Sequence, residues 1–321
     1  MKLAVLSPGL LTTVQDAGRV GWRHLGAAQC GALDGATAML ANHLVGNDPG
    51  EAVLELTLQG PVLRFERPVR LAICGARVFA RFESVDGDRH VVEGGRPVTL
   101  PAGVLRVGNL RDGARAWLAF AGGVDVPIAL GSRSTDLRGG FGGLEGRALR
   151  SGDELKLRVP PGISCARPRM PKWWIDPHFD ERGLPIRYVP LPSSTALDGR
   201  AWQVSARSNR QGLRLEGAAL DSVRGEEISA PVAPGTVQLP PDGKPIVLLA
   251  DAQTVGGYPR LGHVISADLP RLAHICPGEI VRFQSCDAQT ATRLACAARA
   301  RIARIRLMID KYVIDQPSRG N

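Results

Sequence analysis

Hydrophobic residues recur along most of this chain in short stretches that glycine, proline or aspartate interrupt. Each stretch has the length and the apolar content of a β-strand. An all-helical bundle would need longer runs with a repeat of three to four residues. The predicted strands are Val53 to Leu56, Val69 to Ile73, Val104 to Val107, Ala116 to Phe120, Glu154 to Val159, Ile246 to Leu249 and Glu279 to Phe283.

Three stretches have helical spacing instead. The first is Asp34 to Val45, in which Asp34 is a candidate N-cap and Gly46 a stop signal. The second is Asp268 to Ile275, in which Asp268 is the candidate cap and Pro270 stands in the first turn. The third follows Asp287, where one apolar stripe predicts an amphipathic helix docked on the body of the protein. Its members are Leu294, Ala298, Ile302, Ile305 and Ile309.

The order of strands and turns repeats along the chain. A strand ending at Ala121 leads into Gly122-Gly123, and a strand ending at Ala250 leads, after a short loop, into Gly256-Gly257. We interpret this as an internal duplication, which predicts two β-domains of similar fold. A stiff, proline-rich stretch from Pro160 to Pro192 would join them. The predicted units are a first domain at 1–160, a connector at 161–184, a second domain at 185–286, and a helix and tail at 287–321.

Composition sets limits on the class of protein. The chain has 321 residues, of which 44% are hydrophobic and 22% charged. No uncharged apolar run reaches the ~18 residues of a membrane-spanning helix, which argues against a membrane span. The apolar stretch between Met1 and Pro8 is too short for the core of a secretory signal. We therefore expect a cytoplasmic protein.

The formal net charge of +9 raises the question of nucleic-acid binding. Much of the excess is local, because the segment from Asp287 to Lys311 holds six basic and two acidic residues. These charges lie mostly off the apolar stripe of the predicted helix, so we interpret them as its solvent-facing side. Contact with a protein partner is the alternative, and neither nucleic acid nor membrane is an expected partner.

Several common chemistries lack their sequence signatures. The six cysteines form no CxxC pair and the six histidines no HExxH motif, so we expect buried free thiols and no metal site. A phosphate-binding GxxxxGK[ST] loop is absent, so this chain is not expected to bind ATP alone. The glycine-rich run Gly139 to Gly146 does not fit a dinucleotide-binding fingerprint, and we interpret it as a mobile loop or lid.

Four polar clusters beside predicted strand ends or glycine turns are the candidate site. In the first, Asp34 is either a helix cap or a ligand. In the last, a buried strand delivers Asp251 and then Gln253, Thr254 and two glycines, which suits a small polar substrate. The clusters are Thr12 to Arg19 with Gly31 to Asp34, Gly131 to Thr135, Ser208 to Leu215, and Gln238 to Pro259.

These clusters, in this order, resemble the biotin-dependent carboxyltransferase family, which includes the C subunits of ATP-hydrolysing 5-oxoprolinase and the allophanate hydrolase subunit 2-like, kinase-inhibitor antagonist proteins. The resemblance covers residues ~3 to 284. It implies two cyclophilin-like β-barrel domains, in agreement with the repeat. The segments that carry it are Gly9 to Asp16, Asn42 to Asn47, Leu54 to Thr57, Gly122 to Pro127, Gly131 to Thr135 and Pro245 to Asp251.

The chain departs from the family pattern in two places. The family commonly reads Ser-Asp-Arg-Met-Gly-Tyr-Arg-Leu where this chain has the segment from Ser208 to Leu215, which lacks the acid, the methionine and the aromatic residue. Leu33 stands where many relatives have methionine before the aspartate of the turn, which is a volume-conserving exchange.

The resemblance implies three alternative functions. In the first, the chain is part of a 5-oxoprolinase and helps to open 5-oxo-L-proline to L-glutamate, with A-like and B-like partner subunits that supply the ATP chemistry. In the second, it transfers a carboxyl group to urea or a related amide from carboxybiotin, which a separate carrier must bring because no Met-Lys-Met attachment site is present. In the third, it is a non-catalytic, regulatory partner of a kinase-inhibitor protein. No covalently bound cofactor is expected.

Both enzymatic alternatives need donors for the negative charge that develops on a carbonyl oxygen. The predicted catalytic residues are Arg133 as a donor, Asp251 as the group that orients the substrate or accepts a proton, and Asp34. Whether Asp16, Asp34, Glu55 or Asp251 is the acid or base stays open. The predicted substrate-binding residues are Gln15, Asp16, Glu55, Ser134, Thr135, Arg210, Gln238, Gln253, Thr254, Gly256, Gly257 and Tyr258.

Overall fold

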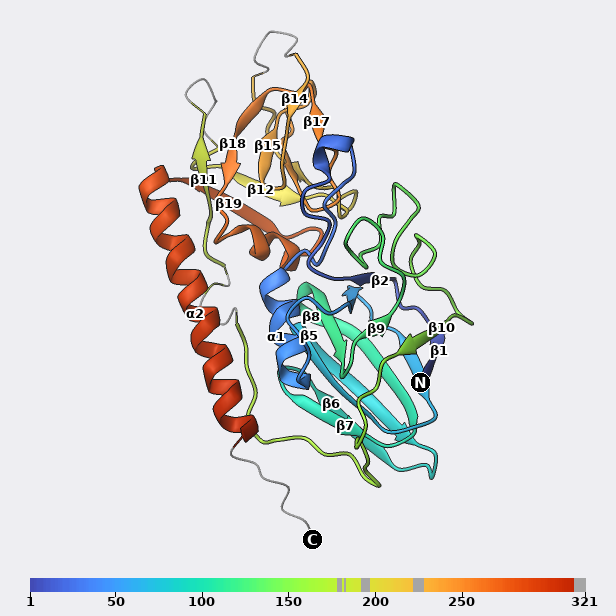
Figure 1. The fold of residues 1–321 in the computed structure, drawn as a ribbon. Helices are drawn as coiled ribbons and strands as arrows, with labels where there is room; N and C mark the ends of the chain where they lie inside the picture. The colour runs from blue at the N-terminus through green and yellow to red at the C-terminus, as the bar shows by residue number, and fades with distance from the viewer. Residues whose placement is uncertain (178–180, 182, 192–196, 222–227, 315–321) are drawn as a thin grey trace.

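The computed structural model describes residues 1–177, 181, 183–191, 197–221 and 228–314, with backbone only at 313 and 314 (Figure 1). His178, the end of the proline-rich stretch at Pro192 and the tail from 315 onward lie outside the described residues. Two β-domains follow one another along the chain, and a long C-terminal helix runs past both of them (Figure 1). The protein is mainly β, as the sequence predicts.

The first domain is one large, curved sheet in which the described residues form ten strands. Its main path has the order β2-β3-β8-β4-β1-β10-β9, and β5 carries β6 and β7 beside β8. Buried side chains on its inner face form one apolar core. The strands are β1 (Lys2–Ser7), β2 (Leu11–Gln15), β3 (Val53–Thr57), β4 (Val62–Phe65), β5 (Val69–Ser84), β6 (Arg89–Glu93), β7 (Pro97–Leu100), β8 (Gly103–Phe120), β9 (Val124–Asp125) and β10 (Glu154–Leu157).

The strand β8 corrects one prediction. Separate strands were predicted at Val104 to Val107 and at Ala116 to Phe120, but one strand runs through both. The polar stretch between them stays in the ladder because β5 pairs with β8 from Leu71 opposite Phe120 to Ser84 opposite Gly103. Two register shifts in that pairing absorb the irregular part. Pairing with β5, which is distant in sequence, therefore determines that β8 is one continuous strand.

The second domain is a closed barrel among the described residues, with the strand order β11-β18-β15-β16-β13-β12-β19. Its core includes the fully buried side chains of Tyr188 and Trp202. A two-stranded ribbon, β14 with β17, lies at one end of it. The strands are β11 (Ile186–Pro190), β12 (Ala201–Val204), β13 (Gly212–Glu216), β14 (Ala230–Pro231), β15 (Thr236–Gln238), β16 (Ile246–Leu248), β17 (Val255–Gly256), β18 (Arg260–Val264) and β19 (Ile280–Ser285).

The two halves differ at the glycine pairs that suggested a duplication. Gly122 and Gly123 both have a left-handed backbone, with φ of 84° and 77°. Gly256 instead lies in strand β17, where it pairs with Ala230, and neither it nor Gly257 has positive φ. The two turns are therefore not equivalent in backbone conformation, and the duplication itself stays a prediction.

The first predicted helix is confirmed as α1 (Gly35–Val45). The Asp34 side chain accepts a hydrogen bond from the Thr37 N–H, which satisfies one of the free donors at the helix start. Gly46 ends the helix in the left-handed conformation, with φ of 82°. A short 3₁₀ helix, η1 (Arg23–Leu25), precedes α1.

The second predicted helix forms, but as a short 3₁₀ helix and without the capping hydrogen bond. Residues Leu269–His274 form a 3₁₀ helix, η3, and the Asp268 side chain makes no capping hydrogen bond. Asp268 accepts instead from the backbone N–H of Arg187 at 2.7 Å and from its Nε at 2.8 Å. A charged partner on β11 thus outcompetes the local cap.

The C-terminal helix α2 (Ala288–Ile314) confirms the predicted amphipathic docking. Ile309 is buried, and Ile302 and Ile305 pack against the same apolar cluster as α1. His43 and Asp310 add an ion-pair contact between the two helices at 2.8 Å. No helix within the described part of the chain is long and apolar enough to span a membrane.

We predict that Ile309→Ala lowers the free energy of unfolding by about 2 kcal/mol, since it removes a buried branched side chain. The matched control is Leu307→Ala on the same helix, where the side chain is 69% exposed and little change is expected. Urea unfolding of both variants measures the difference. Equal, small effects would mean that α2 does not contribute its apolar stripe to the core.

The cysteine prediction is confirmed only in part. All six cysteines are free thiols, but only Cys30 and Cys74 are buried. The others are half-buried or, for Cys296 on α2, exposed. Most of these residues lie in loops or on α2 rather than in a strand of the core.

Candidate functional site at the junction of the two domains

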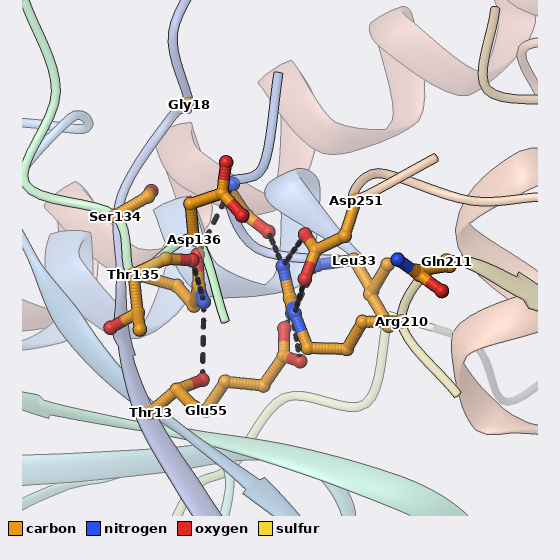
Figure 2. A network of polar contacts seen from close by, with 12 residues as sticks. Thr13, Gly18, Leu33, Glu55, Ser134, Thr135, Asp136, Arg210, Gln211 and Asp251 are labelled. Atoms are coloured by element: carbon orange, nitrogen blue, oxygen red, sulfur yellow. Dashed lines mark hydrogen bonds and ion pairs between the residues drawn. The ribbon is translucent and has the colours of Figure 1, made fainter. Parts of the chain in front are cut away.

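The guanidinium of Arg210, from the second domain, lies between the carboxylates of Glu55 and Asp251 at the junction of the two domains (Figure 2). Arg210 lies in the turn before β13, where Asn209 and Gly212 form an isolated bridge. Its Nε and Nη2 donate to the two oxygens of Asp251 at 2.9 and 2.8 Å. Its Nη1 donates to Glu55, and its Nη2 also donates to the carbonyl oxygen of Gly31 at 2.7 Å. All the nitrogens of this guanidinium are therefore engaged.

Glu55 is held from several sides on strand β3. One oxygen accepts from the backbone N–H of Leu33 at 2.9 Å and from the Trp117 indole at 3.0 Å. The other lies 3.6 Å from Arg115 Nε. Burial alone would raise the pKa of Glu55, but the charges of Arg210 and Arg115 and these hydrogen bonds together hold the pKa below its ordinary value.

This network connects the two domains through charge. Glu55, Arg115 and Gly31 belong to the first domain, and Arg210 and Asp251 to the second. The two guanidinium groups of Arg115 and Arg210 and the two carboxylates of Glu55 and Asp251 lie together in the interior, where the Glu55 residue is 1% and the Asp251 residue 3% exposed to solvent. Buried charges are tolerated when they are paired and hydrogen-bonded, so the relative position of the domains and the pairing depend on each other.

Asp251 is therefore placed differently from the prediction. Asp251 was predicted to face a pocket together with Gln253, Thr254 and Tyr258, as a group that orients the substrate or accepts a proton. Both of its oxygens accept from Arg210, which leaves it paired rather than poised as a base. Its catalytic role stays a prediction, and the geometry favours a structural one.

We predict that Asp251→Asn lowers the free energy of unfolding by about 1–2 kcal/mol, because Arg210 keeps Glu55 as a counterion. Turnover of the assembled complex should stay within ~10-fold of the unmodified protein, since general acid–base loss costs 10²-fold or more. Melting temperature and turnover are to be measured on one preparation. A stable variant with turnover reduced ~10²-fold would restore Asp251 to chemistry.

A second cluster surrounds Asp16 at the end of β2. Its carboxylate accepts from the Gly18 N–H at 2.8 Å and from the Arg133 N–H at 2.5 Å. The hydroxyls of Ser132 and Ser134 each donate to it at 2.6 Å. Asp16 thus organises the hydroxyl-rich turn, and Arg133 contributes its backbone rather than its guanidinium to these bonds.

Gln15 and Thr135 extend this cluster through further hydrogen bonds. The Gln15 amide accepts from the Gly31 N–H at 3.1 Å and donates to Thr13 Oγ1 at 3.1 Å and to the Thr135 carbonyl at 3.2 Å. The Thr135 hydroxyl donates to the Val14 carbonyl at 3.0 Å. Gln15, Ser134 and Thr135 therefore lie together, with their polar groups used in internal bonds.

Asp34 proves to be both a cap and a partner of histidine. Besides Thr37, it contacts His274 Nε2 at 2.9 Å, and the His274 ring lies against Trp117 with ring centroids 5.4 Å apart. His274 also lines a cavity of about 300 Å³ between η3, β19 and the first domain. Asp34 is thus linked to the Trp117 ring by way of His274, whereas Glu55 accepts a hydrogen bond from the indole of the same Trp117. The catalytic role of Asp34 stays a prediction.

The remaining predicted residues lie at the end of β15, on β17 and in the segments that flank β17. Gln238 is buried and accepts from the Gln253 amide at 3.4 Å, while its own Nε2 has no hydrogen-bond partner among the described residues. The carbonyl of Thr254 accepts from the Val232 N–H at 3.0 Å. Tyr258 is exposed and lines a separate groove with Arg207 and Lys244. The structure does not bring these residues and Gly257 together with the Arg210 network.

Four site residues escaped the sequence analysis. Arg115 and Trp117 alternate within an apolar strand, so their pattern resembles core packing. His274 gave no signal, because its partner Asp34 is distant in sequence. Arg19 stood at the end of the first polar cluster but had no pattern that singled it out. Among the described residues, no group of three or more His, Cys, Asp or Glu side chains could hold a metal ion.

Hydrogen-bond donors that have no partner within the protein indicate which ligands the junction can bind. Within the described part of the chain, the buried nitrogens without a hydrogen-bond partner include Arg133 Nε and the Nε and Nη1 of Arg19. Such donors suit the oxygen of a carboxylate or of a polarised amide carbonyl. The arrangement can therefore bind a small, oxygen-rich anion or amide.

Comparison with known proteins shows which family the chain is similar to. The chain is 40% identical over 302 residues to the C subunit of 5-oxoprolinase from Escherichia coli, with 91% of this chain and 93% of that relative covered. It is 32% identical over 320 residues to urea amidolyase of Lachancea kluyveri, but spans only 17% of that protein.

A solved structure agrees with this. The Kluyveromyces lactis urea amidolyase superposes with a TM-score of 0.81 at 27% identity, over 94% of this chain and 20% of that one. The model of the carboxyltransferase domain, subdomain A and B, matches residues 25–285. The chain therefore belongs to the carboxyltransferase domain family, subdomains A and B.

Proposed function

We propose that this chain is a component of an ATP-dependent 5-oxoprolinase, which opens 5-oxo-L-proline to L-glutamate together with A-like and B-like partner subunits. The observation that carries the proposal is the similarity to the 5-oxoprolinase C subunit of Escherichia coli over nearly the whole of both chains. The complex would work in the cytoplasm, where ATP is available.

The reaction suits the donors at the junction. Opening the lactam breaks its C–N bond, adds the elements of water and places negative charge on the carbonyl oxygen during attack. In our proposal Arg133 stabilises that charge, because its half-buried guanidinium is not used in the turn around Asp16. The fixed network of Glu55, Arg210 and Asp251 would hold both domains in the arrangement that this requires.

ATP enters the proposal through a partner. The sequence has no GxxxxGK[ST] loop, so activation of the lactam by ATP is assigned to the A-like or the B-like protein. This chain then contributes binding and orientation of the lactam. Its isolated form is expected to show no ATP-dependent turnover.

Carboxyl transfer is the alternative, and the urea amidolyase relatives favour it. Carboxybiotin on a separate carrier would then deliver the carboxyl group to urea or a related amide. A non-catalytic role beside a kinase-inhibitor protein is the other alternative, in which no turnover of any kind is expected.

Reconstitution tests these functions against each other. The chain is purified with its A-like and B-like partners, and glutamate and ADP formed from 5-oxo-L-proline and ATP are measured. The control omits this chain, which should abolish glutamate formation. Turnover with urea, bicarbonate and a biotinylated carrier, but not with 5-oxo-L-proline, would support carboxyl transfer instead. No turnover in either assay would leave the regulatory role.

A further inference from the structure

Arg19 is a fully buried arginine that forms no ion pair with any carboxylate of the described residues. It follows β2 and the Asp16 turn, and its backbone N–H donates to the Gln29 carbonyl at 2.7 Å. The side chain is 0% exposed. No carboxylate of the described residues lies within ion-pair distance of it, and the nearby Asp16 already accepts from four donors.

The guanidinium of Arg19 uses only part of its hydrogen-bonding capacity. Nη2 donates to the Ser134 carbonyl, and the Phe141 ring lies 4.4 Å from the guanidinium carbon. Nε and Nη1 are buried and have no hydrogen-bond partner among the described residues. A buried cation with free donors costs folding free energy, so it is retained where it meets an anion.

The half-buried Phe141 and Gly142 cover part of the Arg19 guanidinium. Phe141 and Gly142 lie directly on the guanidinium, and a side chain at Gly142 would collide with Arg19 Nη2 and the Ser134 carbonyl. Gly139 and Gly140, just before them, are exposed to solvent. Gly140, Gly142 and Gly143 have positive φ. The segment is held by the Asp136 N–H, which donates to the Phe141 carbonyl at 2.9 Å, and by the Gly143 N–H, which donates to the Arg133 carbonyl at 3.0 Å, so these two bonds must open for a ligand to reach Arg19.

Arg19 also lies next to the junction network. The segment from Gln29 to Gly31 contacts Arg19 at one end and accepts from Arg210 at the other. Burial raises the pKa of the Cys30 thiol between them, Asp251 and Asp136 raise it further, and the charges of Arg19 and Arg210 lower it. A ligand held by Arg19 would therefore be adjacent to the interdomain site.

We propose that Arg19 binds the carboxylate of the substrate when the segment from Gly139 to Gly143 lifts, and that Phe141 and Gly142 then close over it. This inference rests on the proposed function, because 5-oxo-L-proline carries one carboxylate beside its lactam. The guanidinium supplies the charge-assisted hydrogen bonds that the free nitrogens leave available. Phe141 excludes water from that pair, which strengthens it.

The test compares two ligands that differ only in the carboxylate. Binding of 5-oxo-L-proline and of 2-pyrrolidinone to the assembled complex is measured by calorimetry for the unmodified protein, for Arg19→Gln and for Arg19→Lys. We expect Arg19→Gln to weaken 5-oxo-L-proline binding by ~10²-fold and to leave 2-pyrrolidinone binding unchanged. Arg19→Lys keeps the charge but not the planar fork, so ~10-fold weaker binding is expected. The control is Arg81→Gln on the exposed face of β5.

Stability separates a binding residue from a structural one. Loss of an unneutralised buried charge should leave the melting temperature of Arg19→Gln unchanged or higher. A lower melting temperature with unchanged 5-oxo-L-proline affinity overturns the inference, as does an equal loss of affinity for both ligands. If Arg19→Gln does not fold, the charge-preserving Arg19→Lys decides by the same comparison. Binding of 5-oxo-L-proline without turnover by the unmodified complex would count against the proposed function alone.

Discussion

Arg210→Met is expected to lower the free energy of unfolding by about 3–5 kcal/mol, the cost of breaking a buried ion pair from one side. Methionine fills a similar volume, but it leaves the carboxylates of Asp251 and Glu55 buried without their shared ion-pair partner, and Arg115 Nε lies 3.6 Å from Glu55 alone. It also removes the hydrogen bond to the Gly31 carbonyl, which crosses the domain boundary. Urea unfolding followed by far-ultraviolet circular dichroism measures the loss.

Two variants control this experiment. Arg207→Met removes an arginine of the same domain whose ion pair with Glu216 is largely solvated, with 71% of the Arg207 side chain exposed, so a change below ~1 kcal/mol is expected. Arg210→Met combined with Asp251→Leu removes one charge of each sign and leaves Glu55 with Arg115. The double variant should be more stable than Arg210→Met alone. A loss below ~1 kcal/mol for Arg210→Met would show that the network does not hold the domains.

Glu55 is expected to make stability depend on acidic pH. Its folded-state pKa lies below the ordinary value of 4.5, so the folded state takes up this proton less readily than the unfolded state. The stabilisation from Glu55 is therefore fully present above pH ~4.5 and is lost as the pH falls through the folded-state pKa. Glu55→Gln should cost about 3 kcal/mol at neutral pH and should flatten the decline of stability below pH ~4.5.

The measurement is the free energy of unfolding between pH ~3 and 7 for the unmodified chain and for Glu55→Gln. Glu154→Gln is the control, because Glu154 forms an exposed ion pair with Lys2 and should leave the acid profile unchanged. Parallel acid profiles for the unmodified protein and Glu55→Gln would contradict the assignment, since other carboxylates would then account for the decline.

Local sequence determined those elements whose signals need no distant partner. Asp34 and Gly46 bracket α1 because a cap and a left-handed stop act within one turn of the helix. The stripe on α2 was readable because its period follows from helix geometry alone. Where a distant strand or charge intervened, as β5 did for β8 and Arg187 for Asp268, local patterns failed.

For the candidate site, the sequence supplied the residues but not their relations. Gln15, Asp16, Ser134, Thr135, Arg210 and Asp251 were identified in polar clusters beside strand ends or glycine turns, and Glu55 through the family segment Leu54 to Thr57. The structure gathers them at the junction. Whether Asp251 acts as a base or as a counterion depends on Arg210, 41 residues away along the chain. Pairing of that kind is a tertiary property.

The sequence by itself therefore determined the mainly β class, the two helices with their own caps or stripe, and the family through its motifs. Only the tertiary structure decided that Glu55 and Asp251 neutralise Arg210, that Tyr258 points to a different groove, and that Arg19 is buried without a counterion among the described residues. The physical reason is the distance along the chain over which each interaction acts. Periodicity and capping act over a few residues, whereas burial and charge pairing depend on which distant segments the fold brings together.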